Sequence, residues 1–92
     1  MTPEPTVLQQ VSQFAAGVRA GEVEERLLQD ARRRVTDIIG IALAASGMEP
    51  ARVVGEVIDG WGGEGQASAI GRSSRFPTAS AALLNGTLAH AL

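Results

Sequence analysis

The chain contains no cysteine and no lysine, and it has only one histidine. Without cysteine there is no disulfide, no thiolate nucleophile and no cysteine-ligated zinc or iron–sulfur site. Without lysine there is no side chain for a Schiff base or for the phosphate contact of a P-loop. A single histidine also excludes a cluster of histidine metal ligands within one chain. The lack of disulfides fits a cytoplasmic protein, and this is the location we expect.

Aromatic residues and excess charge are scarce as well. Three aromatic side chains and a net charge of −2 argue against a base-stacking surface and against attraction to nucleic acid or anionic lipid. The longest apolar run, residues 38–45, is far shorter than the roughly 20 residues that span a bilayer. The acidic, proline-containing residues 1–5 do not resemble an export signal. We therefore expect a soluble protein that binds neither nucleic acid nor a membrane.

Helical periodicity dominates the first half of the sequence. Thr6 is placed to cap a first helix, which Gly17 or Gly21 ends. In the second helix, apolar residues three and four apart form a continuous seam from residue 28 to residue 45, and Gly47 is the expected stop. These two helices are predicted to face each other.

The second half predicts two more helices and a link. One helix begins at residues 49–50, because proline suits the first helical position. The glycine-rich residues 60–65 read as a connection rather than a phosphate loop, since no strand precedes them. Residues 66–70 are a short extended segment, and a last helix starts after Pro77 and is still running at the end of the chain.

These patterns predict an all-α fold, a small bundle of about four helices with one short extended segment. Ninety-two residues form one domain at most, and we take residues 1–92 as a single partial domain, part of a larger helical domain. The residues predicted to form the core share three- and four-residue spacing. They are Val11, Phe14, Val35, Ile38, Ile39, Leu43, Val54 and Ile58.

Three residues near the end of the chain are the candidate site. His90 is the one classical acid–base residue of the chain, but no carboxylate lies within a helical turn of it, so an exposed or structural role is the alternative to catalysis. Gly86 interrupts a helical pattern, which indicates close helix packing or a nearby ligand. Asn85 can hydrogen-bond either a neighbouring segment or a ligand.

The segment from Asn85 to Leu92, NGTLAHAL, resembles the stretch that leads into the active site of the MmgE/PrpD family of 2-methylcitrate dehydratase-like lyases. Residues 37–44, DIIGIALA, and residues 69–71 resemble earlier parts of that family in the same order. In the family an acidic motif of the form Asp-(Phe/Tyr)-Asp-Asp follows at once. We therefore expect this chain to be an amino-terminal piece that stops one residue before that motif.

The resemblance implies a helical domain of a lyase that handles small polycarboxylates without a metal or organic cofactor. Family members include the 2-methylcitrate dehydratases of propionate metabolism, cis-aconitate decarboxylases and related epimerases. Carried over to this sequence, it implies a catalytic-site position for His90 and substrate-binding positions for Asn85 and Gly86. The family's aspartate and its later histidines and lysines have no counterpart here, so whether this chain is an enzyme is left open.

Two functions follow from the sequence. The first is the amino-terminal piece of such a lyase, inactive by itself, which meets its polycarboxylate substrate only in a full-length context. The second is a stand-alone helical module that covers its apolar faces by self-association or on a partner. In either case we expect a homo-oligomer, because exposed apolar patches usually bind something.

Overall fold

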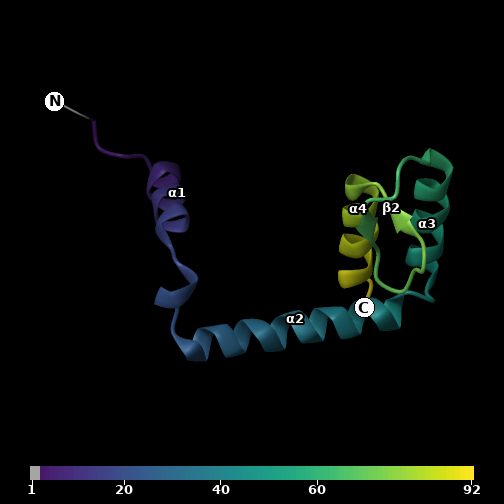
Figure 1. The fold of residues 1–92 in the computed structure, drawn as a ribbon, viewed down its shortest axis with the longest axis horizontal. Helices are drawn as coiled ribbons and strands as arrows, with labels where there is room; N and C mark the ends of the chain where they lie inside the picture. The colour runs from purple at the N-terminus through teal and green to yellow at the C-terminus, as the bar shows by residue number, and fades with distance from the viewer. Residues whose placement is uncertain (1–2) are drawn as a thin grey trace. The chain divides into compact units, whose positions relative to one another are not determined.

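The computed structural model describes residues 3–92 and consists of helices and one small hairpin (Figure 1). The elements occur in the order α1 (Val7–Gly17), a 3-10 turn (Ala20–Glu22), α2 (Glu25–Ala45), α3 (Glu49–Trp61), β1 (Ala67–Ser68), β2 (Arg75–Phe76) and α4 (Thr78–Ala89). The predicted helical fold class is confirmed. The chain divides into two compact units, residues 1–32 and residues 33–92, and each is described by itself below.

In the first unit, α1 begins with the cap that the sequence predicts. The Thr6 hydroxyl accepts from the backbone N–H of Gln9 at 3.1 Å, and the Gln9 side chain accepts from the Thr6 N–H at 2.8 Å. This reciprocal pair satisfies two backbone donors that a helix start leaves open. No residue of α1 is buried, and Phe14 is 74% exposed. The predicted burial of Val11 and Phe14 is therefore wrong, because no other described residue of the first unit covers the apolar face of α1.

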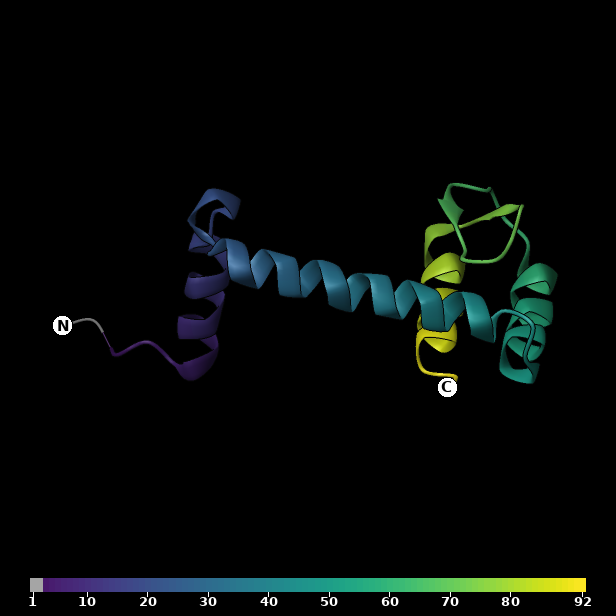
Figure 2. The ribbon, with the colours of Figure 1, turned by 90° about the horizontal axis from the view of Figure 1, so that it is seen from below.

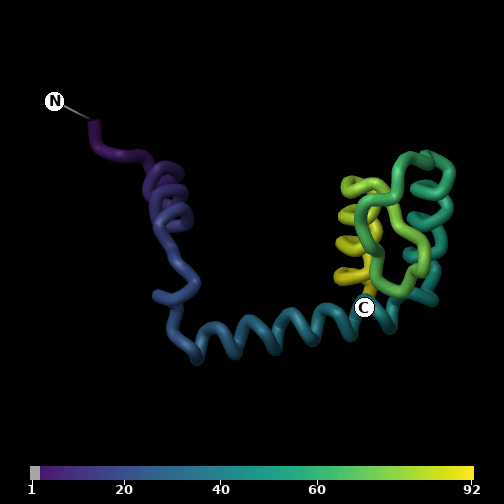
Figure 3. Tube along the Cα trace, viewed as in Figure 1, coloured from purple at the N-terminus to yellow at the C-terminus, as the bar shows by residue number. Residues whose placement is uncertain are grey.

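In the second unit, α3 and α4 pack side by side and the hairpin lies against α4 (Figures 1 and 2). The tube in Figure 3 follows the chain from α3 through the hairpin and back into α4. Side chains from all of these elements, together with the end of α2, form one core. Its buried members are Ala42, Ala45, Ala51, Ile58, Ala69, Phe76, Ala81, Leu84 and Leu88.

The core uses small residues of α2 and α3 where the sequence pattern favoured large ones. Ala42 and Ala45 are the buried residues of α2, and Gly55 is buried in α3 beside Ala51 and Ile58. Small side chains let the elements approach closely, so the bulky residues of α2 stay outside this core. Ile58 is buried as predicted, and Val54 is half-buried against the core. The remaining core prediction is wrong for the large α2 residues, which are exposed: Val35, Ile38, Ile39 and Leu43.

The predicted extended segment is one half of an antiparallel hairpin. Ala67 pairs with Phe76, and Ser68 pairs with Arg75. The second strand was not predicted, because a two-residue strand is too short to show an alternating pattern. In the intervening turn Gly71 has a φ of +80°, a conformation that residues with a Cβ atom rarely adopt. A Cβ atom there would also lie 2.6 Å from the Cβ of Ser46, so this turn packs tightly on the end of α2.

Two helix ends differ from the prediction. Helix α2 ends at Ala45, and Gly47 does not take the positive φ of a glycine helix stop. The Ser46 hydroxyl instead donates to the Leu43 carbonyl at 2.6 Å. Helix α4 ends at Ala89 rather than running on, and the His90 N–H donates to the carbonyls of Thr87 and Leu88. The last turn of α4 thus ends with hydrogen bonds between neighbouring residues of the chain.

Among the residues that the structure describes, no single helix has both the length and the apolar character to cross a membrane. Helices α2 and α3 reach that threshold only as a pair, on length and composition alone, and the pair is bent by 83°.

Candidate functional site

Helix α4 carries Asn85 and Gly86, and His90 follows directly as its C-terminal cap residue; these are the three residues that the sequence singled out. Pro77 precedes its first turn, and the helix is fixed to the second unit by the buried side chains of Ala81, Leu84 and Leu88. Because those residues recur every three or four positions, they hold one face of α4 against the core. Asn85 is half-buried, whereas Gly86 and His90 are exposed.

The Asn85 amide is bonded at both ends to the hairpin. Its Oδ1 accepts from the backbone N–H of Ile70 at 2.8 Å, and its Nδ2 donates to the carbonyl of Ser68 at 3.1 Å. The sequence left a neighbouring segment and a ligand as alternatives for this side chain. In the structure the amide bonds the neighbouring segment, and it ties α4 to the end of β1.

Gly86 is not a point of close packing. A Cβ atom at this position would meet no side chain and no backbone of another segment within 4 Å. The interpretation of Gly86 as a close-packing residue is therefore wrong. The other interpretation, that Gly86 lies beside a bound ligand, stays a prediction.

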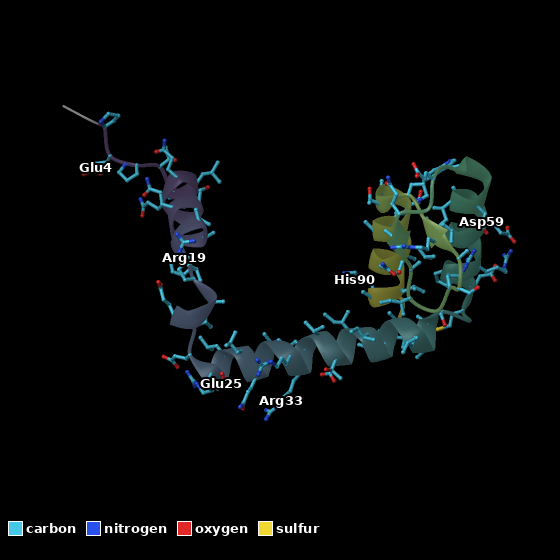
Figure 4. All side chains as sticks on the ribbon, in the orientation of Figure 1. Glu4, Arg19, Glu25, Arg33, Asp59 and His90 are labelled. Carbon is cyan, nitrogen blue, oxygen red and sulfur yellow. The ribbon has the colours of Figure 1, made fainter. Side chains whose placement is uncertain are left out.

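His90 lies on the surface just past the end of α4, and Figure 4 shows its side chain on the edge of the second unit opposite Asp59. Among residues 3–92, no hydrogen-bond or ion-pair partner of the imidazole is found. General acid–base catalysis needs a partner that orients the imidazole or shares the proton. The described residues of this chain supply none.

The second unit has a pocket of about 310 Å³, and none of the three candidate residues lines it. Its lining is mostly apolar and includes two arginines. The lining residues are Ser46, Gly47, Met48, Ala51, Arg52, Ile70, Arg72, Leu84 and Leu88. Asn85 touches this pocket only indirectly, through its hydrogen bond to Ile70.

Both pocket arginines are already paired. Arg52 bonds the Glu49 carboxylate and donates to Glu56 at 2.9 Å. The hydrogen bond from Arg52 lowers the pKa of Glu49, and the pKa of Arg52 is raised first by Glu49 and then by Glu56. These three side chains are largely exposed, so water screens the pairs and they add little stability.

Arg72 joins the hairpin turn to α3. Its Nη2 lies 2.9 and 3.1 Å from the two carboxylate oxygens of Asp59, and its guanidinium carbon lies 5.2 Å from the centre of the Phe76 ring. Its Nη1 occupies the space beside Gly55, where a Cβ atom would come within 2.6 Å. The sequence assigned no role to Arg72, because its partner is 13 residues away and no periodic pattern links the two.

The two remaining sequence motifs, the glycine-rich residues 60–65 and the arginines at 32–34, form a connection and an exposed surface. The glycine-rich residues 60–65 connect α3 to β1, as predicted, and Gly62 and Gly63 have positive φ. The three arginines at 32–34 are exposed. No group of three histidine, aspartate or glutamate side chains within residues 3–92 is placed to hold a metal ion. The described chain thus has a small pocket and an isolated histidine, but no acid–base pair.

No curated protein and no solved structure matches the chain significantly. The profile of the MmgE/PrpD N-terminal domain matches residues 9–92, which include α4 and all three candidate residues. A match over nearly the whole sequence agrees with the motifs at residues 37–44 and 85–92, and the chain belongs to the MmgE/PrpD family.

Proposed function

We propose that this chain supplies the amino-terminal helical part of a cofactor-independent lyase acting on small polycarboxylates such as 2-methylcitrate, and that it does not turn over substrate by itself. The family match over residues 9–92 carries the first half of the proposal. The isolated position of His90 supports the second half.

The chemistry explains why His90 would be insufficient alone. Removing a proton next to a carboxylate needs a positioned base and donors that stabilise the developing negative charge. His90 is the chain's one histidine, and the pocket arginines are committed to Glu49, Glu56 and Asp59. A histidine without its partners loses factors of about 10²–10⁴ in rate for each missing group.

We expect the purified chain to show no turnover of 2-methylcitrate or cis-aconitate, and the same result for a His90→Ala variant. The measurement is dehydration of the first acid and decarboxylation of the second, each followed by product formation. Because His90 is exposed, the variant should fold as the wild type does, which circular dichroism checks. Turnover by the wild type that disappears in His90→Ala would contradict the proposed inactivity.

A second candidate function is self-association through α2, and the exposure of its large apolar residues favours it. Val35 is 55% exposed and Ile38 is 48% exposed, although the two share a face with the buried Ala42 and Ala45. Exposed apolar stripes of this kind usually mark a surface that another protein segment covers. In this second proposal the cover is another copy of the chain.

Replacing both Val35 and Ile38 by glutamate is expected to shift the chain to a monomer in sedimentation equilibrium, because two charges would be desolvated at the contact. The matched control is Arg33→Glu. Arg33 lies about 200° from Val35 around the helix, so it faces away from this stripe and its replacement should leave association unchanged. A wild-type chain that is monomeric at high micromolar concentration would rule out self-association.

A further inference from the structure

The Asn85–Gly86 step has a chemical property that the proposed function does not use. Asn85 is the sole asparagine of the chain, and glycine follows it. This pair is the one most prone to spontaneous deamidation, because glycine has no side chain to hinder attack by its own backbone nitrogen. We propose that Asn85 is a deamidation-sensitive latch between α4 and the hairpin: the intact fold suppresses the reaction, and the reaction, once it has occurred, opens the latch. This inference is independent of any catalytic role.

The reaction needs only water. The backbone nitrogen of Gly86 loses its proton and attacks Cγ of Asn85. A bond forms between that nitrogen and Cγ, the bond from Cγ to Nδ2 breaks, and ammonia leaves. Water then opens the resulting succinimide ring at one of its two carbonyls, which yields aspartate or isoaspartate.

The folded structure opposes the first step in two ways. Residues 85 and 86 lie within α4, where helical backbone angles keep the nitrogen away from Cγ and the N–H of each interior residue bonds the carbonyl four residues earlier. The Asn85 amide is also held by the bonds to Ile70 and Ser68 at 2.8 and 3.1 Å. Attack therefore requires α4 to open locally and both hydrogen bonds to break.

The same region provides the route for that opening. Helix α4 ends at Ala89, three residues beyond Gly86, and helix ends fray. Gly86 itself weakens the helix by about 1 kcal/mol relative to alanine. No other segment packs against the position of its missing side chain. Opening the last turn of α4 takes Leu88 out of the core but leaves Ala81 and Leu84 in place, so it is less costly than unfolding the whole unit.

The product cannot rebuild the latch. The Nδ2 donor is replaced by a carboxylate oxygen, and that oxygen would face the Ser68 carbonyl with no proton between them. Two oxygens repel at the 3.1 Å that the hydrogen bond now spans. Isoaspartate also lengthens the backbone by one carbon, which the regular helix cannot accommodate. Aspartate keeps an oxygen that could accept from the Ile70 N–H, but the repulsion at the Ser68 carbonyl pushes the carboxylate away from the hairpin, so the Ile70 N–H loses its close acceptor.

The test compares deamidation of the folded and denatured chain by intact mass and peptide mapping, at mildly alkaline pH. We expect the denatured chain to be modified at Asn85 at least about tenfold faster, which corresponds to about 1.4 kcal/mol of local opening free energy. Gly86→Ala is the matched control, because alanine fits the open space, strengthens the helix and hinders the attack. It should slow the reaction in both states. Equal rates in the folded and denatured wild type would overturn the proposal.

The second measurement follows the latch itself. Hydrogen exchange of the Ile70 amide should be slow in the wild type and in Gly86→Ala, and clearly faster in the deamidated fraction separated by ion exchange and in Asn85→Asp. Retained protection of Ile70 in the deamidated fraction would refute the latch. The rate comparison stands even if Asn85→Asp does not fold, since it uses the wild-type chain.

Discussion

Replacing Ile58 by alanine is expected to lower the free energy of unfolding by about 2–5 kcal/mol, the range for a large aliphatic residue in a packed core. Ile58 is 1% exposed and lies in the core between α3 and α4. Domains of this size have stabilities at the lower end of about 5–15 kcal/mol, so the loss could unfold the second unit. The measurement is urea denaturation followed by far-ultraviolet circular dichroism.

Ile38→Ala is the matched control, because it removes the same atoms from a residue that is 48% exposed. Substitutions at such positions usually change stability by no more than about 0.5 kcal/mol. The comparison is made over a range of protein concentrations, since any self-association through α2 would add a concentration-dependent loss to the Ile38 variant. A larger loss for Ile38→Ala than for Ile58→Ala at high dilution would contradict the core described here.

The comparison of Ile58 with Ile38 shows what the spacing of apolar residues can predict and what it cannot. The three- and four-residue spacing placed the helices well, and Glu49 and Thr6 mark helix starts as the sequence predicts. Spacing identifies an apolar face but not what covers it. In α2 one face holds both the buried Ala42 and the exposed Ile38, because the elements of the second unit cover only its end.

For the candidate site, the sequence predicted the family but not the contacts of the side chains. The motif at residues 85–92 identified the family, and the family match covers it. The contacts of Asn85 reach 15 and 17 residues back along the chain, to a hairpin whose strands are two residues each. No local pattern encodes a pairing of that separation, and the same holds for Arg72 with Asp59 and Phe76. These long-range polar contacts therefore could not be predicted from the sequence.

Gly71→Ala is expected to destabilise the second unit by about 2–5 kcal/mol, from two separate causes. A residue with a Cβ atom pays about 1–2 kcal/mol for the left-handed conformation that Gly71 adopts at a φ of +80°. The new Cβ would also lie 2.6 Å from the Cβ of Ser46, and relieving such an overlap costs about 1–3 kcal/mol. Urea denaturation of the variant beside the wild type measures the sum.

A double-mutant cycle with Ser46→Gly separates the two causes. Removing the Ser46 side chain eliminates the overlap, so the cost of Gly71→Ala in that background should fall to the conformational part alone. The cycle also accounts for the hydrogen bond from Ser46 to the Leu43 carbonyl, which both Ser46→Gly backgrounds lack. Gly86→Ala serves as the control for glycine replacement in general, because its site is helical and open, and it should stabilise by up to about 1 kcal/mol. If Gly71→Ala proved as stable as the wild type, the turn would not pack on the end of α2 as described, and the tie between α2 and the hairpin would have to be rejected.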